Sequence, residues 1–492
     1  MADAPTRLDA DLLYRPCHAG SLPFESTAEL EPPMPAPGQD RALEALDFGT
    51  EIADGGFNLY ALGSAGLGKY AVVREFLENR AREDDPPPSW AYVFNFENPD
   101  RPRLLELPAK AGRELQKDLE NLVSEFGTAI PAVFESDEYH NRIQELREAF
   151  KRRQREAIEA ISKEAEERHV AMVSTPSGFT LGPYRDGKIL DPEAFHELPE
   201  EEQKEWQAAI NELEEKLKQT LQQIPKWQKE ARDQLQELNE EMLGVAVGQQ
   251  LESLKRRWVT LPAVIEYLGA IRDDIISHVN DLDDEGSTVP EEILNQYQLN
   301  LIVDNGDLDG APVIYEDLPT HARLIGRIEH YFREGALLTD FRLIRAGALH
   351  RANGGYLILH ARQILMQPFA WETLKRALYG KQVRIESLEQ LYAVFTTITL
   401  EPDPLPLEVK VVLIGDRLLY YLLSEYDPDF ARLFKVQADF EDHLARQPEN
   451  EMDYARTLAA ITQRDGLRAL DRSAVARTIE HASRLAGDRE KL

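Results

Sequence analysis

The sequence contains a single cysteine, Cys17, among its 492 residues. An intrachain disulfide is therefore excluded, and a chain without disulfides fits a reducing compartment. Long apolar runs are also missing, and no stretch approaches the ~20 apolar residues of a membrane span. The first thirty residues lack a continuous apolar run, so we expect no signal peptide. These absences together predict a cytoplasmic protein with no membrane partner.

Basic residues are scarce relative to acidic ones. The 56 Lys and Arg residues are outnumbered by 88 Asp and Glu residues, for a net charge of −32. Because nucleic-acid binding depends on neutralising phosphates with Lys and Arg, this balance argues against nucleic acid as the main partner. Catalytic patterns are scarce too, since the sequence has no H-E-x-x-H pair for zinc and no serine in the context of a Lys dyad. We therefore predict no metal site and no catalytic residue within this chain.

What the sequence does contain is a glycine-rich phosphate loop. Residues 63–70 read GSAGLGKY, which follows the pattern G-x-x-x-x-G-K-[ST] except at the last residue. Gly63, Gly66 and Gly68 would let backbone N–H groups turn toward phosphate oxygens. Lys69 would reach the outer phosphates. The pattern predicts a nucleotide-binding loop.

The last position of this loop is altered. The pattern requires a small hydroxyl that ligates Mg²⁺, and the sequence has Tyr70, whose phenol oxygen lies too far from its backbone. A buried-strand pattern over residues 57–62 and a helical pattern over residues 71–77 provide the context that the motif requires. The alternative is a plain glycine-rich turn that binds nothing.

A second magnesium-ordering position is also altered. In a P-loop ATPase, an acidic residue at the end of another buried strand positions Mg²⁺. The best candidate strand, residues 356–359, ends in His360, and imidazole is a poor ligand for this hard cation. The alternative strand, residues 409–414, ends near Asp416. With both Tyr70 and His360 altered, we expect a site that hydrolyses ATP poorly.

The middle of the chain has a different pattern from the two ends. Between about 137 and 258, apolar residues recur at helical spacings between charged faces, which predicts two long helices in an antiparallel coiled-coil arm. Pro225 should kink the second helix. Between the helices lies a β-like tip, with a hairpin turn expected at Asp186 and Gly187. The alternative is a helical bundle folded against the body.

Four further segments carry a resemblance to a known family. These are residues 95–102 (NFENPDRP), 347–357 (GALHRANGGYL), 367–372 (QPFAWE) and 427–436 (DPDFARLFKV). They resemble the AAA+ part of Lon-like proteases of the LonB or LonC type, and the resemblance covers about residues 20–492. It implies an AAA+ P-loop α/β sheet domain with a long coiled-coil insertion and a C-terminal helical lid. It also implies a hexameric ring that passes unfolded polypeptide to a C-terminal Lon-like protease domain.

The resemblance divides the chain into five expected segments. They are an N-terminal arm (1–37), the AAA+ α/β domain in two parts (38–136 and 286–443), the coiled-coil insertion with its β tip (137–285), and a helical lid (444–492) that ends early. The Ser-Lys catalytic domain of the family would follow after Leu492.

Departures from the family pattern concern the nucleotide site. Tyr70 and His360 replace residues that other members use for magnesium. The family's arginine finger would be displaced to Arg432, because Ala431 stands where the Arg is usual. Arg484 falls where the sensor arginine of the lid would be. These losses resemble the LonC-type branch, which works without ATP hydrolysis, so we expect no required cofactor and at most weak ATP or ADP binding.

Two groups of residues are candidates for contact with polypeptide substrates. Tyr331 and Phe332 precede a glycine, as in a mobile loop that faces a pore, although they could instead be buried under that loop. Met172, Phe179 and Tyr184 in the tip form the second group.

The leading hypothesis is an AAA+-like module that selects unfolded or damaged proteins for a Lon-like serine protease. A working ATP-dependent unfoldase is the first alternative, and a stand-alone chaperone or adaptor is the second.

Overall fold

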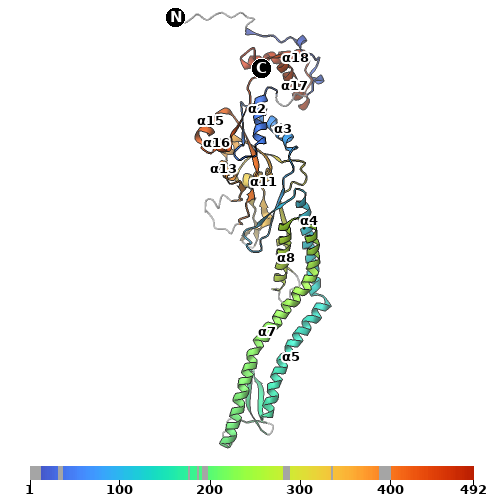
Figure 1. The fold of residues 1–492 in the computed structure, drawn as a ribbon, viewed down its shortest axis with the longest axis vertical. Coiled ribbons are helices and arrows are strands. Elements are labelled where there is room, and N and C mark those ends of the chain that lie inside the picture. The colour runs from blue at the N-terminus through green and yellow to red at the C-terminus, as the bar shows by residue number, and fades with distance from the viewer. Residues whose placement is uncertain are drawn as a thin grey trace. The chain divides into compact units, whose positions relative to one another are not determined.

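The computed structural model describes residues 13–31, 37–175, 178–185, 188–190, 195, 198–280, 289–333, 336–386 and 400–492. The chain forms two compact units (Figure 1). The first combines Met1–Lys117 with Leu299–Leu492, and the second is Asp118–Gln298. The five segments expected from the sequence are a finer division and stay a prediction.

The first unit is built around a five-stranded parallel sheet. Its strand order is β17-β1-β16-β13-β8, and every neighbouring pair is parallel. The strands are β1 (Leu59–Leu62), β8 (Val313–Glu316), β13 (Gly355–His360), β16 (Val409–Gly415) and β17 (Val436–Asp439). The apolar runs at residues 356–359 and 409–414 are therefore strands, as predicted. A mixed α/β fold with a parallel sheet is confirmed.

Helices cover both faces of this sheet, which explains why its strands read as continuous apolar runs. Along β1, Tyr60 and Leu62 belong to one apolar core, whereas Leu59 and Ala61 belong to the other. The core that contains Leu59 includes residues of α2 (Asp40–Glu51) and α3 (Lys69–Ala81). The opposite core includes residues of α10 (His321–Ile325), α11 (Ala348–Arg351), α12 (Ala361–Met366), α13 (Ala370–Gly380), α15 (Arg417–Tyr426) and α16 (Phe430–Leu433).

Smaller sheets complete the α/β part of the first unit. An antiparallel sheet of order β3-β2-β7 joins β2 (Ser89–Val93), β3 (Arg103–Leu107) and β7 (Leu299–Val303). Three short antiparallel pairs are β9 (Arg327–Ile328) with β12 (Ile344–Arg345), β10 (Tyr331–Arg333) with β11 (Ala336–Leu338), and β14 (Gln382–Val383) with β15 (Leu405–Pro406). The 3₁₀ helix η3 (Phe341–Leu343) leads into β12.

The C-terminal helices pack together with the N-terminal segment. α17 (Pro448–Arg464) and α18 (Arg472–Ala486) share an apolar core with residues beside the 3₁₀ helices η1 (Ala19–Ser21) and η2 (Thr27–Glu29). Leu22 and Phe24 are buried there against Val475 and Ile479. The Thr27 N–H also donates to the Leu470 carbonyl (2.8 Å). The described part of the N-terminal arm is thus bound to the C-terminal helices.

The second unit consists mainly of long helices. α4 (Ala111–Phe134) begins in the first unit and ends in this one. The other elements are α5 (Asp137–Glu167), β4 (Val170–Thr175), β5 (Gly178–Arg185), β6 (Lys188–Ile189), α7 (Glu200–Arg257), α8 (Pro262–Asn280) and α9 (Glu291–Gln296). Pro225 lies inside α7 and does not interrupt it. No helix in the described ranges is long and apolar enough to cross a membrane.

α5 and α7 lie side by side and run antiparallel (Figure 1). Their side chains join Tyr139 to Asn239 (2.8 Å), Arg153 to Glu230 (2.8 Å) and Arg168 to Glu212 (2.6 Å). The start of α5 therefore lies beside the C-terminal half of α7, and the end of α5 lies beside the N-terminal part of α7. The strands β4, β5 and β6 form the predicted antiparallel tip. The turn expected at Asp186 and Gly187 lies outside the described residues.

Candidate functional site

The phosphate loop follows strand β1 and leads directly into helix α3, as the sequence pattern predicts. Gly66 (φ 90°) and Gly68 (φ 68°) adopt left-handed backbone conformations that favour glycine. A Cβ built on either glycine would meet no atom within 4 Å, so this part of the loop is open. The backbone therefore fits an approaching phosphate group.

Lys69 is directed back onto the loop itself. Its Nζ donates to the carbonyl oxygens of Gly63 and Ser64, both at 2.6 Å, and the residue is buried. Burial lowers the pKa of the Lys69 ammonium, although the nearby Asp442 acts in the opposite direction. To reach a bound phosphate, Lys69 would have to exchange these two carbonyls for phosphate oxygens.

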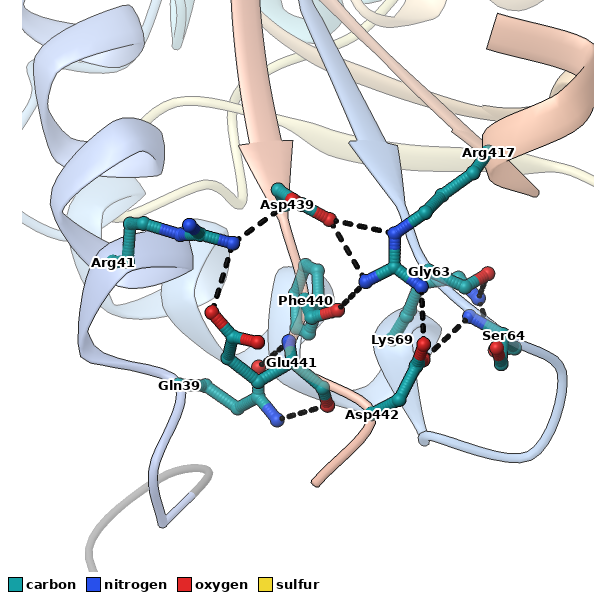
Figure 2. A network of polar contacts seen from close by, with 10 residues as sticks. All are labelled: Gln39, Arg41, Gly63, Ser64, Lys69, Arg417, Asp439, Phe440, Glu441 and Asp442. Atoms are coloured by element: carbon teal, nitrogen blue, oxygen red, sulfur yellow. Dashed lines mark hydrogen bonds and ion pairs between the residues drawn. The ribbon is translucent and has the colours of Figure 1, made fainter. Parts of the chain in front are cut away.

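A network of hydrogen bonds and ion pairs connects the phosphate loop to the segment that follows β17 (Figure 2). The Ser64 N–H donates to Asp442 Oδ1 (3.2 Å), and the other Asp442 oxygen pairs with Arg417 Nη1. Arg417 Nε also donates to Asp439 (3.1 Å). Burial alone would raise the pKa of Asp442, but the hydrogen bonds from Ser64 and the ion pair with Arg417 outweigh it and lower that pKa. The sequence analysis did not identify Arg417 or Asp442.

The same segment is tied to helix α2. Arg41 pairs with Asp439 (2.8 Å) and with Glu441 (2.8 Å). The side chain of Gln39 donates to the Glu441 carbonyl (3.1 Å) and accepts from the Glu441 N–H (2.8 Å). Residues 439–442 are therefore held between α2 and the phosphate loop, as Figure 2 shows.

The two altered magnesium positions lie close together in space. The ring centroids of Tyr70 and His360 are 6.4 Å apart. Tyr315, at the end of β8, lies between them in the packing, at 4.6 Å from Tyr70 and 5.8 Å from His360. Sequence analysis missed Tyr315, because nothing in the local pattern connects β8 to the loop. Three rings thus form an aromatic cluster of Tyr70, Tyr315 and His360.

This aromatic cluster offers poor ligands to magnesium. Mg²⁺ prefers carboxylate, phosphate and water oxygens in octahedral geometry, and the cluster contains two phenols and an imidazole. Burial lowers the pKa of His360, and it outweighs a backbone hydrogen bond with Ile414 that raises this pKa; the positive charge of Lys69 adds to the lowering, which favours the neutral imidazole. In the part of the chain that the structure describes, no three His, Cys, Asp or Glu residues are grouped so that they could hold a metal ion.

The alternative acidic position, Asp416, has a structural role in this fold. It follows β16 and caps helix α15, because its Oδ1 accepts from the Leu419 N–H (2.7 Å). The negative charge of Asp416 still acts on Lys69, because it partly offsets the lowering of the Lys69 pKa by burial. Asp416 is thus near the loop but is already engaged by a helix terminus.

The two arginines predicted for the nucleotide site, Arg432 and Arg484, do not contact the phosphate loop of their own chain among the described residues; because an arginine finger acts in trans on a neighbouring copy, both roles stay predictions. Arg432 is exposed on α16, and its carbonyl packs against Gly56, which precedes β1, whereas the phosphate loop follows β1. Arg484 is exposed on α18 and lines a cavity together with Tyr14 and Arg446. Within the described ranges, neither side chain makes a hydrogen bond or ion pair with the loop.

The first group of candidate substrate contacts is accessible. Tyr331 and Phe332 lie on β10, with 43% and 74% of their surfaces exposed. The alternative, that these rings are buried, is therefore wrong. Residues 334–335, which follow β10, lie outside the described residues.

The second group divides between the two faces of the tip. Met172 and Phe179 are partly buried against the apolar cluster of the tip and its two helices. Tyr184 is exposed, and so are Val173 and Ile189, which the sequence analysis did not select. Tyr184 and Ile189 are paired across β5 and β6. Because side chains alternate along a strand, the exposed face of the tip carries a different set of apolar residues from the buried face.

Comparisons with known proteins match several parts of the chain. Family profiles match residues 309–441 ("LonB-like, AAA domain"), 89–122 ("Lon-like LonC helical domain") and 469–492 ("Archaeal LonB, AAA+ ATPase LID domain"). A curated protein from Escherichia coli (strain K12), "Putative Lon protease homolog", is 26% identical over 150 residues. That match covers 30% of this chain and 25% of the relative, so this chain spans a quarter of its length.

Among solved structures, NtrX from Brucella abortus has a TM-score of 0.21 and 15% identity, covering 37% of this chain and 42% of that chain. A similarity at this level carries no argument about fold or function. The conclusion rests on the family profiles and on the curated relative: they support a Lon-like protein that contains an AAA+ domain.

Proposed function

We propose that this chain is the AAA+-like, substrate-selecting and gating part of a Lon-like serine protease, and that it works without hydrolysing ATP. The observation that carries the proposal is the aromatic cluster, in which Tyr70 and His360 contact Tyr315 beside the phosphate loop. In this account unfolded or damaged proteins are bound and passed on. Cleavage requires a Ser-Lys domain that is not among these residues.

The chemistry of phosphoryl transfer explains why the cluster matters. Catalysis depends on a metal ion that bridges the β- and γ-phosphates and on a group that orients the attacking water. Phenol and neutral imidazole groups supply neither function well. The loop backbone would still bind phosphate oxygens, so weak ATP or ADP binding is expected, with no nucleotide required. This combination supports assignment to the LonC-type branch.

An active ATP-dependent unfoldase is the second candidate. The observation that favours it is the retained loop, with Gly66 and Gly68 in left-handed conformations and Lys69 at the start of α3. Magnesium-dependent turnover separates the two candidates.

Self-association into a ring is supported by one exposed face of α15. Leu418, Tyr421, Leu422 and Tyr426 are exposed at helical spacings of three, four and eight residues. These four side chains are uncharged, and Glu425 is the acidic residue that shares their face, although the chain carries a net charge of −32. Two copies of so acidic a chain repel each other least where their surfaces carry few charges, so a second copy is the expected occupant. We name Leu418, Tyr421, Leu422 and Tyr426 the α15 face.

A long coiled-coil arm formed by α5 and α7 is the proposed substrate-binding insertion. Its tip exposes Val173, Tyr184 and Ile189, and β10 of the first unit exposes Tyr331 and Phe332. Aromatic and aliphatic side chains bind unfolded chains of any sequence, because they bury apolar area without specific polar partners.

The first prediction concerns nucleotide turnover. We expect the protein to hydrolyse ATP far more slowly than the ~1 s⁻¹ lower end of ordinary enzymes, because Tyr70 and His360 are poor magnesium ligands. Tyr70→Thr with His360→Asp should restore two oxygen ligands and strengthen magnesium-dependent ATP binding in calorimetry. Tyr70→Val with His360→Leu is the matched control, with similar shapes and no oxygens. Wild-type turnover at or above ~1 s⁻¹ would favour the unfoldase.

The second prediction concerns assembly. Leu418→Glu with Tyr426→Glu should shift the protein from a ring toward smaller species in size-exclusion chromatography with light scattering, because it places charges on the α15 face. Leu467→Glu with Leu485→Glu, at two other exposed leucines, controls for the two added charges. If the doubly substituted protein assembles like the wild type, the α15 face is not the contact between copies.

The third prediction concerns the tip. Tyr184→Ser with Ile189→Ser should weaken binding of fluorescent, denatured casein by at least about tenfold, since fully burying even one such side chain contributes about 1.5–3 kcal/mol. Met172→Ala, on the buried face, should mainly lower the thermal stability of the tip. Fluorescence anisotropy and circular dichroism measure the two effects. Unchanged casein binding by the Tyr184/Ile189 variant would remove the exposed face of the tip from substrate recognition.

A further inference from the structure

The C-terminal helices and the N-terminal segment enclose a cavity that the proposed function does not use. Its volume is about 330 Å³, and its walls include Arg15, Arg446, Arg484 and Arg489. We propose that this cavity binds a small phosphate-bearing anion, and we name it the arginine cavity. It belongs entirely to the first unit and contains no residue of the phosphate loop.

The strongest evidence is an unpartnered atom of Arg446. Only 1% of this side chain is exposed. Its Nε pairs with Glu451 (2.9 Å), and its Nη1 donates to the Arg15 carbonyl (2.7 Å) and to Ser483 Oγ (3.4 Å). Its Nη2 is buried without a partner in the described part of the chain. A buried guanidinium donor without an acceptor is costly, and this guanidinium belongs to a residue of the cavity wall.

The other arginines add positive charge that is only partly balanced. The Arg15 guanidinium donates to the Arg446 backbone carbonyl (3.1 Å) and pairs with Glu490 (2.5 Å), so Arg15 is bound to the segment that carries Arg446. Arg489 also pairs with Glu490 (3.3 Å), so this one carboxylate forms ion pairs with two arginines. Arg484, in the last turn of α18, makes no ion pair among the described residues.

The acidic residues of the cavity wall are engaged elsewhere. Glu480 accepts from the Cys17 N–H (2.9 Å) and pairs with Arg477, outside the cavity wall. Asp488 accepts from the Glu490 N–H (2.9 Å) in a local turn. Four arginines therefore line the cavity: Glu490 pairs with Arg15 and Arg489, Glu451 pairs with Arg446, and Arg484 makes no ion pair among the described residues.

The size and donors of the cavity define the class of ligand. A volume of about 330 Å³ lies at the lower end of small-molecule sites, which suits phosphate, pyrophosphate or a small phosphorylated metabolite. Guanidinium groups bind phosphate oxygens through two parallel hydrogen bonds. The C-terminal end of α18 opposes an anion with about half a negative charge, which is less than the charge of a single arginine.

The test is calorimetric titration of the full chain with pyrophosphate, inorganic phosphate and ADP at constant ionic strength. We expect pyrophosphate to bind to wild type and Arg484→Gln to weaken its binding at least about tenfold, through loss of a charge-assisted hydrogen bond. Arg484→Lys keeps the positive charge but loses the two parallel guanidinium donors, so its pyrophosphate affinity should lie between those of the wild type and Arg484→Gln. Arg468→Gln, an equal charge change at an exposed position outside the cavity, should bind like wild type.

Lys69→Ala separates this cavity from the phosphate loop. Pyrophosphate affinity should be unchanged by Lys69→Ala if the anion binds in the arginine cavity. In the Lys69→Ala protein, whose phosphate loop is weakened, stronger binding of phosphate than of ADP points to a free anion in the arginine cavity, and the reverse order points to the phosphates of a nucleotide there. The proposal is overturned if pyrophosphate does not bind wild type, if Arg484→Gln binds it as wild type does, or if only Lys69→Ala abolishes binding.

Discussion

The packing of Tyr70 against Tyr315, with His360 completing the group, is the interaction on which the rest of the account depends. The Tyr70 and Tyr315 ring centroids are 4.6 Å apart. Tyr70 lies in the first turn of α3, the helix that follows the phosphate loop. A loop whose backbone fits phosphate therefore lies beside side chains that are poor magnesium ligands. Under the proposed function, this arrangement separates phosphate binding from hydrolysis, since phosphate contacts need the glycines and catalysis needs the metal.

The loop is also connected to the C-terminal helices. Asp442 accepts from the Ser64 N–H, and two residues further on the Leu444 N–H donates to the Leu492 carbonyl (3.1 Å). A change in the loop, such as the departure of Lys69 from its two carbonyls, would thus act on a segment that leads directly into α17. Under the proposed function, this short covalent path is where phosphate binding would influence gating.

The sequence predicted the elements whose evidence is local. Apolar runs identified β13 and β16, and the glycine spacing identified the strand, loop and helix around residues 63–70. It could not identify Asp442, whose bond to Ser64 spans 378 positions, because hydrogen-bond partners at that separation leave no periodic pattern. Tyr315 was not identified either, because its ring contact with Tyr70 also joins residues that are far apart in the sequence. In the tip, the strands were predicted, but not which face each side chain would occupy, because that depends on the strand register.

The central claim is that this phosphate loop has no magnesium site, and the affinity of the wild-type protein for ADP, measured with Mg²⁺ and with EDTA, tests it most directly. The account predicts that the two dissociation constants agree within about twofold, since the phosphates contact only the loop backbone and Lys69. An affinity for ADP that is at least about tenfold higher with Mg²⁺ would contradict it, because a gain of that size requires the protein to order the metal.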